Sequence, residues 1–183
     1  MAEITKLWIA DRMRELMKHK PIEKIRVTEI CREADIERPT FYYHFRDKYD
    51  LVAWMFCAEA CGTDIASEAS AAAALNSMKR EILFYRRAYE DVSQNALWRY
   101  MVDYFARRYT ELAKERTGAE ILDTQLAYSI RFYCMGAVGM TREWVLGDNI
   151  TSAETAVRMM FASMPENMRS ALFGAAGNGG EST

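Results

Sequence analysis

Apolar residues recur at three- and four-residue spacing along nearly the whole chain, and no segment alternates between apolar and polar residues as a half-buried strand does. In residues 3–19, for example, Ile9, Met13 and Leu16 fall on one face of a helical wheel, and Pro21 marks the end of that helix. The pattern therefore predicts an all-α fold.

Two short helices follow, joined by a tight turn. The first is predicted over 27–34, Asp35 interrupts it, and a helical pattern restarts near Arg38 with Pro39 in the first turn, where the missing N–H has no intrahelical role. Phe41 and Phe45 lie four residues apart, and we expect them to face a core. A second helix that carries Arg, Thr, Tyr, Tyr and His in one run is typical of the recognition helix of a helix-turn-helix.

The rest of the chain is predicted to be helical with few interruptions. A fourth helix opens near residue 47, a loop or frayed end is expected over 67–77, where large side chains are absent, and a helical pattern resumes over 78–90. Either Ser93 or Asn95 caps the next helix, which Gly118 ends.

The most apolar helix is expected over 119–146, where Gly136 and Gly139 allow close backbone approach and Gly147 follows the end. Thr151 and Glu154 have the spacing of a capping box for a last long helix, which Pro165 kinks or ends. A final turn is expected to bury Met168 and Leu172, with a disordered tail over 174–183.

Composition limits the class of protein but does not itself indicate a partner. The 183 residues carry a net charge of −2, half are apolar, and only three are proline, which fits a globular helical protein with its own core. Residues 1–50 hold 11 Lys and Arg against 10 Asp and Glu, so DNA binding would depend on local presentation of side chains. Without a signal-peptide core, a membrane span or a disulfide framework, we expect a cytoplasmic protein with reduced thiols.

A resemblance to a known family rests on residues 38–51. This run, RPTFYYHFRDKYDL, closely resembles the recognition helix and following turn of TetR-family transcriptional regulators, and the preceding V-x-x-I-C-x-x-A fits the first motif helix of that family. A finer resemblance, to the branch containing regulators of dihydroxyacetone kinase operons, rests on the doubled tyrosine at 42–43, on DKYDLVAW at 47–54 and on SQNALWRYM at 93–101.

The resemblance implies a TetR-like architecture: a helix-turn-helix domain at 1–47 and a helical regulatory and dimerisation domain at 48–173. It implies a homodimer that binds a palindromic DNA operator, and in which the last two long helices of each subunit form a four-helix bundle between the subunits. The residues expected at this dimer interface are Tyr133, Ala137, Met140, Trp144, Val157, Met160, Phe161 and Met164.

DNA contacts are implied position by position. Thr40, Tyr42, His44 and Lys48 match family residues that hold phosphate oxygens, whereas Arg38, Pro39 and Tyr43 match positions that reach base edges in the major groove; Arg26 and Thr28, at the start of the first motif helix, complete the expected set. The sequence departs from the family pattern at three positions, and at one of them Arg26 replaces the threonine that usually opens the first motif helix. Asp35 replaces the usual glycine of the turn, and Glu37 replaces the usual small capping residue.

An effector pocket is the second site that the resemblance implies. Its candidates are the aromatic and methionine-rich positions of the C-terminal part together with one arginine: Trp54, Tyr85, Tyr89, Trp98, Met101, Tyr104, Tyr128 and Arg131. The same aromatic stripes can equally be core, and Arg131 can equally form a buried ion pair between subunits.

Other chemistry is weakly indicated. Cys57 and Cys61 lie one helical turn apart, which permits a thiol or metal site but fits small buried apolar residues better. The Arg86-Arg87 and Arg107-Arg108 pairs are expected on solvated faces, and no catalytic motif, metal site or cofactor is predicted. The expected function is a repressor controlled by a small molecule or protein partner; the alternative is an activator or docking regulator controlled by a kinase-like protein, without a small-molecule pocket.

Overall fold

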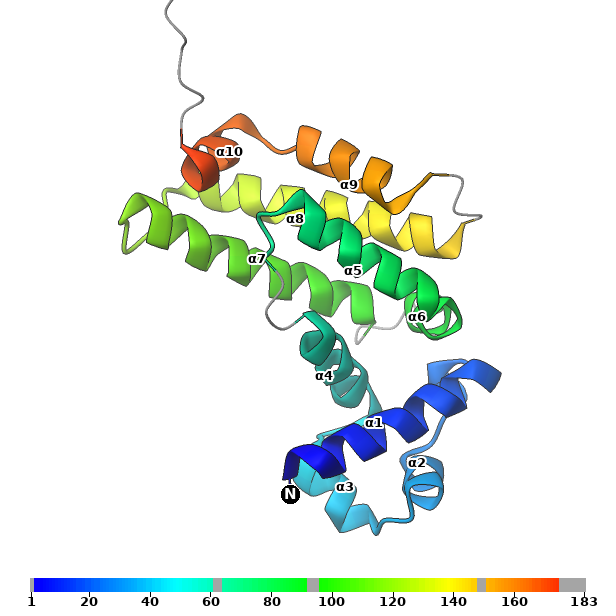
Figure 1. The fold of residues 1–183 in the computed structure, drawn as a ribbon. Helices are drawn as coiled ribbons and strands as arrows, with labels where there is room; N and C mark the ends of the chain where they lie inside the picture. Colours follow the sequence, from blue (N-terminus) through cyan, green and yellow to red (C-terminus); the bar gives the residue numbers. More distant parts are fainter. Residues whose placement is uncertain (1, 61–63, 92–95, 148–150, 175–183) are drawn as a thin grey trace, which may run out of the picture.

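The computed structural model describes residues 2–60, 64–91, 96–147 and 151–174. Within these ranges the chain forms ten α-helices and one short 3-10 helix with no strand, so the predicted all-α fold is confirmed. The N-terminal helices form a small head at one end of the molecule, and the later helices form a larger body at the other (Figure 1).

The head contains α1 (Ala2–His19), the 3-10 helix η1 (Ile22–Lys24), α2 (Val27–Ala34) and α3 (Arg38–His44). Its core is made of apolar residues from each helix, all almost fully buried: Ile9, Met13, Met17, Ile30, Phe41 and Phe45. Helix α2 covers the predicted residues and α3 begins at the predicted Arg38, so both predictions are confirmed.

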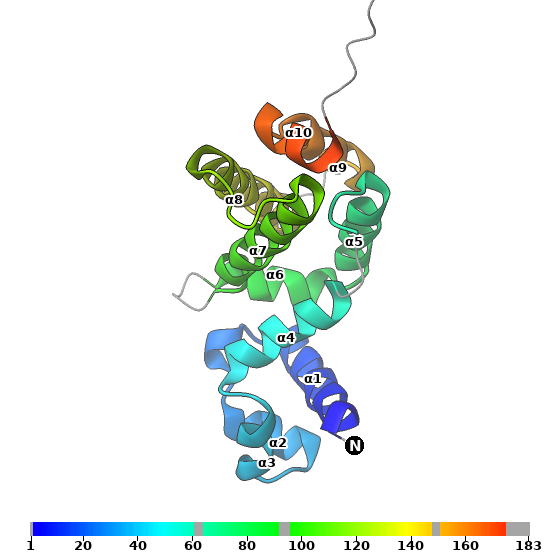
Figure 2. The same cartoon turned by 90° about the vertical axis from the view of Figure 1, so that its left-hand side faces the viewer.

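Helix α4 (Lys48–Ala60) leaves the head and lies between it and the body (Figures 1 and 2). The prediction of a loop or frayed helix end over 67–77 is wrong, because α5 (Glu68–Arg80) covers nearly all of this segment. The Ser67 hydroxyl accepts a hydrogen bond from the Ser70 amide, alanine has the highest helix propensity, and Leu75 and Met78 anchor the helix in the core. The helix predicted over 78–90 is divided at Glu81, where α6 (Ile82–Glu90) begins.

Helix α7 (Leu97–Thr117) ends at Gly118, whose φ of 70° is the expected left-handed cap. Its N-cap is Ala96, without a side-chain hydrogen bond, and the predicted caps Ser93 and Asn95 lie outside the described residues. Helix α8 (Thr124–Leu146) begins five residues later than predicted, because the Asp123 carboxylate accepts from the Leu126 amide and caps it there.

Helix α9 (Ala153–Ala162) and α10 (Glu166–Phe173) complete the body, separated by Pro165 as predicted. The capping box expected from Thr151 and Glu154 is wrong by one residue, because the Ser152 hydroxyl accepts from the Thr155 amide. Met168 and Leu172 are buried, as expected. Apart from Gly174, the predicted tail lies outside the described residues.

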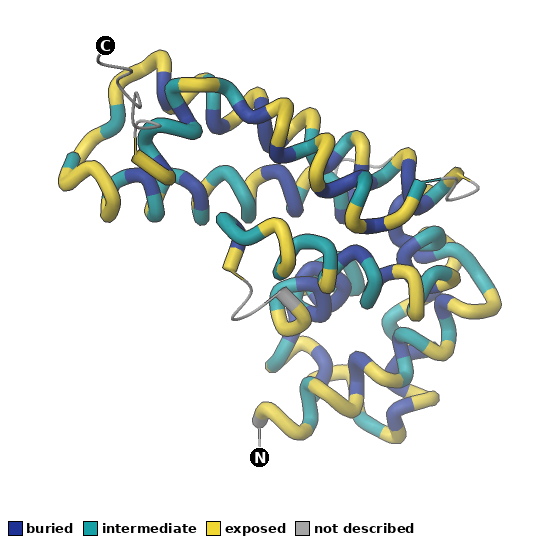
Figure 3. Tube along the Cα trace, turned by 45° about the horizontal axis from the view of Figure 1, so that its top comes forward, coloured by how far each residue is buried: buried dark blue, intermediate teal, exposed yellow. Residues whose placement is uncertain are grey.

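Helices α7 and α8 pack side by side in the body, α5 packs against α9, and α6 packs against both α1 of the head and α8 (Figures 1 and 2). Figure 3 shows buried and exposed positions alternating along these helices, as expected where one face of a helix packs and the other meets solvent. In the part of the chain that the structure describes, no helix has the length and apolar content needed to cross a bilayer.

Candidate nucleic-acid interface

The turn between α2 and α3 sets the direction of the second motif helix. Asp35 ends α2 in the left-handed region, with φ 51° and ψ 48°, and the Ile36 amide donates to the Cys31 carbonyl at 3.0 Å. An aspartate tolerates this region better than most residues other than glycine. The family's glycine position can thus hold Asp35 without loss of the turn.

One face of α3 is fixed in the head and the other is free. Phe41 and Phe45 are 0% and 2% exposed and pack on the core, and Trp54 of α4 meets Phe45 edge-on. Tyr43 is 82% exposed on the opposite face, and the predicted core role of the two phenylalanines is confirmed.

The residues predicted to contact DNA gather at the tip of the head. Arg38, Pro39, Tyr42 and Tyr43 are exposed along α3, and Thr40 and His44 are half-buried beside them; Arg26 and Thr28 are exposed at the start of α2. This tip lies at the end of the molecule farthest from α8 and α9 (Figure 2). The arrangement can enter a groove without interference from the body.

The ion pairs near this tip leave the Arg38 guanidinium available for DNA. Glu29 is held by Lys20, whose hydrogen bond lowers the pKa of the Glu29 carboxyl, and Arg32 pairs with Glu33 at 3.0 Å. Arg38 makes no ion pair among the described residues, and its guanidinium lies 5.8 Å from the ring centre of Tyr42. Glu37 gives α3 no side-chain cap hydrogen bond, so this departure from the family pattern leaves the start of α3 without one.

Lys48 is oriented differently from the other candidates. Its ammonium donates to the backbone carbonyls of Glu23 at 3.0 Å and Ile25 at 2.9 Å, and burial lowers its pKa. The side chain therefore ties the start of α4 to the segment before α2, and two of its three N–H donors are already used.

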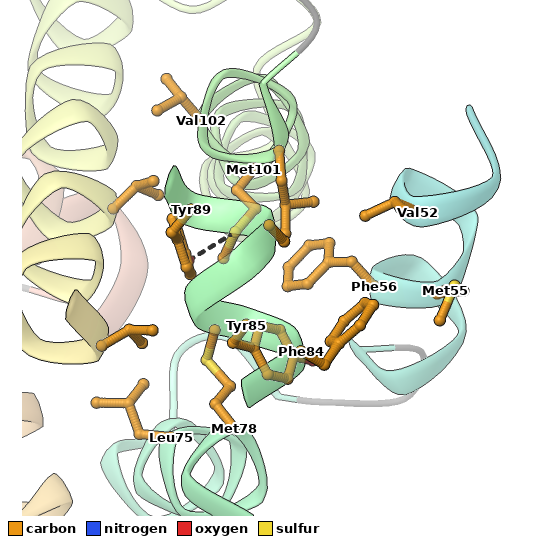
Figure 4. Close-up of a cluster of buried hydrophobic side chains, with 14 of the residues drawn as sticks. Val52, Met55, Phe56, Leu75, Met78, Phe84, Tyr85, Tyr89, Met101 and Val102 are labelled. Atoms are coloured by element: carbon orange, nitrogen blue, oxygen red, sulfur yellow. Dashed lines mark hydrogen bonds between the residues drawn. The ribbon is translucent and has the colours of Figure 1, made fainter. Parts of the chain in front are cut away.

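The residues predicted to form an effector pocket do not line one cavity. Tyr85, Tyr89 and Met101 are buried core residues, and the Tyr89 hydroxyl lies 2.9 Å from the Met101 sulfur (Figure 4). Tyr128, in contrast, is 71% exposed on α8.

Arg131 is also on the outside, and its ion pair with Asp103 of α7 forms within the same chain. Half of the Arg131 side chain is exposed in the single chain, so an ion pair between subunits at this position stays a prediction.

The three remaining pocket candidates are half-buried and serve separate contacts. Trp54 packs on Phe45, Tyr104 meets Phe56 edge-on at 5.6 Å, and the guanidinium of Arg99 lies over Trp98. A helical pattern in the sequence predicts which residues share one face of a helix. It does not show whether that face packs against other side chains or lines a pocket.

A different cavity lies inside the body, bounded by α5, α7, α8 and α9, with a volume of about 110 Å³. Its lining is apolar except for Tyr109, Tyr133, Cys134 and Thr141. The Tyr109 hydroxyl already donates to the Ile65 carbonyl at 2.6 Å, the Thr141 hydroxyl donates to the Ala137 carbonyl at 2.9 Å, and burial raises the pKa of the Cys134 thiol to about 12. This cavity was not predicted, because its lining comes from four helices distant in sequence.

An open apolar groove of about 500 Å³ runs between α8 and α9. Five of the predicted dimer residues line it: Tyr133, Ala137, Met140, Trp144 and Met160. Val157, Phe161 and Met164 are instead buried within the chain's own core. Exposed residues that the prediction omitted share the groove or its continuation along α8, namely Phe132, Met159 and Tyr128.

The remaining polar candidates have ordinary roles. Cys57 lies 2.9 Å from the Tyr100 hydroxyl, Cys61 is outside the described residues, and no three metal-ligating side chains cluster in the described ranges. Arg86, expected on a solvated face, instead donates to the carbonyls of Val145 and Gly147, both at 3.0 Å, and so caps the end of α8.

Comparison with known proteins agrees with this arrangement. Residues 9–55 match the model described as "Bacterial regulatory proteins, tetR family", and residues 67–166 match the model "Transcriptional regulator C-terminal region". No curated protein matches the sequence significantly.

Among solved structures, the chain is similar to "Dihydroxyacetone kinase operon activator DhaS", at 20% identity and a TM-score of 0.58, over 88% of this chain and 96% of that one. At this identity the similarity concerns the fold. The two family matches cover the head and most of the body, and the helix-turn-helix lies where the first match requires it. The chain therefore belongs to the TetR family of bacterial transcriptional regulators, which bind DNA and are not enzymes.

Proposed function

We propose that the protein acts as a homodimer that represses transcription from a palindromic operator, with residues 1–47 as the DNA-binding domain and 48–173 as the regulatory and dimerisation domain. The observation that carries this proposal is the exposed row of Arg38, Pro39, Tyr42 and Tyr43 on α3, held in place by the buried Phe41. Arg38 can donate twice to a guanine, and Tyr43 can contact bases or the thymine methyl. Arg26, Thr28, Thr40 and Tyr42 would hold phosphates and so fix the register.

The dimer interface is proposed on the outer face of α8 and α9. Phe132 and Met140 of α8 and Met159 of α9 are all more than half exposed in one chain, around an open apolar groove. Gly136 and Gly139 lie within α8 on this side, and a Cβ at either position would meet nothing within 4 Å. An interior glycine costs a helix about 1 kcal/mol relative to alanine, and a partner helix that approaches closely would give both glycines a role.

Regulation through a protein partner is the second candidate, and one observation favours it. The cavity between α5, α7, α8 and α9 measures about 110 Å³, well below the roughly 300 Å³ at which small-molecule pockets begin. Hydrogen bonds within the chain already engage the hydroxyls of Tyr109 and Thr141. In this case the body would be a docking surface, and the protein an activator or docking regulator controlled by a kinase-like partner.

Titration of DNA from upstream of the protein's own gene tests the first proposal. The wild type is expected to bind with an affinity that falls steeply with salt. Tyr43→Ala is expected to weaken binding by roughly tenfold to hundredfold through lost base contacts. Ile121→Ala, equally exposed but on the body, serves as the control. Binding that does not exceed that of random DNA, or that Tyr43→Ala leaves unchanged, contradicts the proposal.

Sedimentation equilibrium tests the dimer. Phe132→Glu places a charge in the groove between α8 and α9 and is expected to yield monomers with unchanged helicity, since Phe132 is exposed in one chain. A dimer of undiminished strength would exclude this face. Co-purification then separates the two modes of control: a stoichiometric protein supports docking, and a bound small molecule supports a pocket.

A further inference from the structure

A single carboxylate joins three helices at the boundary between head and body. Glu59, near the end of α4, accepts a hydrogen bond from Arg14 of α1 at 2.6 Å and a second one from the Tyr85 hydroxyl of α6. We call these three residues the joint. Each belongs to a different structural part: the head, the linking helix and the body.

Surrounding residues hold the two donors of the joint in place, whereas Glu59 itself is exposed on α4. Tyr85 is 2% exposed, and the neighbouring Phe84 is also buried (Figure 4). The guanidinium of Arg14 lies 5.1 Å from the ring centre of Phe84 and 3.6 Å from the Glu81 carboxylate. Burial first, and then the charge of Glu59, raise the pKa of the Tyr85 phenol far above its ordinary value, so this group remains a donor at all working pH values.

Two arginines fix α6 to α8. Arg86 of α6 donates to the Val145 and Gly147 carbonyls at the end of α8, and Arg142 of α8 donates to the Tyr89 carbonyl near the end of α6 at 3.1 Å. Each helix thus caps the other. A displacement of α8 must therefore move α6, and α6 carries one of the joint's two donors.

We propose that Arg14, Glu59 and Tyr85 are positioning residues that fix the angle of the head on the body and thereby select the half-site spacing that the dimer accepts. This inference rests on the dimeric DNA binding proposed above. Charge-assisted hydrogen bonds are the strong and directional ones, and here two of them converge on one carboxylate. Two recognition helices must lie about 34 Å apart to enter successive major grooves, so a change in the head angle changes the fit directly.

The test uses the full-length protein and a series of operators. An operator is first selected from random duplexes with the wild-type protein, and its two half-sites are then separated by one or two added base pairs. Each added pair rotates one half-site by about 36°. The quantity compared is the ratio of affinities for the selected and the altered spacing.

The main variant is Tyr85→Phe, which removes the hydroxyl and keeps the buried ring. It is expected to lower the spacing ratio by roughly tenfold, the effect of one hydrogen bond to a charged group. Glu59→Gln is the second variant, expected to act in the same direction. Tyr109→Phe is the matched control, since it removes a buried hydroxyl that donates to the Ile65 carbonyl within the body, and its ratio should equal that of the wild type.

The outcomes separate the two proposals. A wild type that binds no palindrome overturns the proposed function and the role of the joint with it. If the wild type shows a sharp spacing preference and both Tyr85→Phe and Glu59→Gln retain it, only the positioning role of the joint is overturned. If Tyr85→Phe and Tyr109→Phe reduce the ratio equally, the effect is one of general stability, which also overturns the positioning role. Thermal melting of each variant sets a common temperature at which all are folded.

Discussion

Replacing Lys48 by methionine tests whether its ammonium binds a DNA phosphate or only stabilises the fold. Methionine keeps most of the aliphatic stem but removes the ammonium that donates to the Glu23 and Ile25 carbonyls. A hydrogen bond to a charged group contributes about 1.5–3 kcal/mol. Burial lowers the pKa of the Lys48 ammonium, so its charged form carries a desolvation cost that methionine removes. We therefore expect a net loss of about 1–2 kcal/mol in the free energy of unfolding.

Chemical denaturation measures this loss, and a fall of about 2–8 °C in Tm should accompany it. DNA binding supplies the decisive readout. Because two of the ammonium's donors face protein carbonyls, Lys48→Met is expected to lower affinity equally at all salt concentrations and to leave the slope of log K against log salt unchanged. Arg26→Gln, at an exposed position on the tip, should instead reduce that slope by about 1. A reduction of about 1 for Lys48→Met would show that its ammonium binds phosphate and refute the reasoning.

Three further predictions concern the head and the thiols. The lowered pKa of Glu29 means that its contribution to stability is present above the ordinary value of 4.5 and is lost as pH falls through the folded value, so Glu29→Gln should flatten the acid limb of the unfolding curve. Asp35→Gly should raise the free energy of unfolding by about 0.5–1 kcal/mol in urea titrations, because glycine adopts a φ of 51° without strain; a loss would contradict this. Iodoacetamide should modify half-exposed Cys57 before buried Cys134 in the native protein, as peptide mass mapping can show.

The head could be predicted closely from sequence because its signals are local. Pro39 marks the start of α3, and Phe41 and Phe45 are four residues apart, so the buried and exposed faces follow from helix geometry alone. The same holds for Pro165 between α9 and α10. Such features depend on a few neighbouring residues, and they were predicted correctly.

Features that depend on distant contacts were predicted poorly. The alanine-rich α5 was interpreted as a loop because it lacks large side chains, although alanine favours a helix and Leu75 and Met78 supply the anchor. The helical phase of Tyr85 and Tyr89 shows that they face inward but not whether they meet a ligand or other side chains. The residue type of Lys48 indicates a phosphate contact, yet its acceptors are carbonyls more than 20 residues earlier in the chain.

Helix α6 has nine residues, fewer than the roughly 12–15 that an isolated helix needs to persist in water. Its order therefore depends on its neighbours: on the core that buries Phe84, Tyr85 and Tyr89, and on Arg142 of α8, which donates to the Tyr89 carbonyl. The amides of α6 should consequently exchange with solvent hydrogen whenever the end of α8 loosens, even while the rest of the body stays closed. The exchange rate of this one short segment would then report the state of α8, and it would do so without any DNA present.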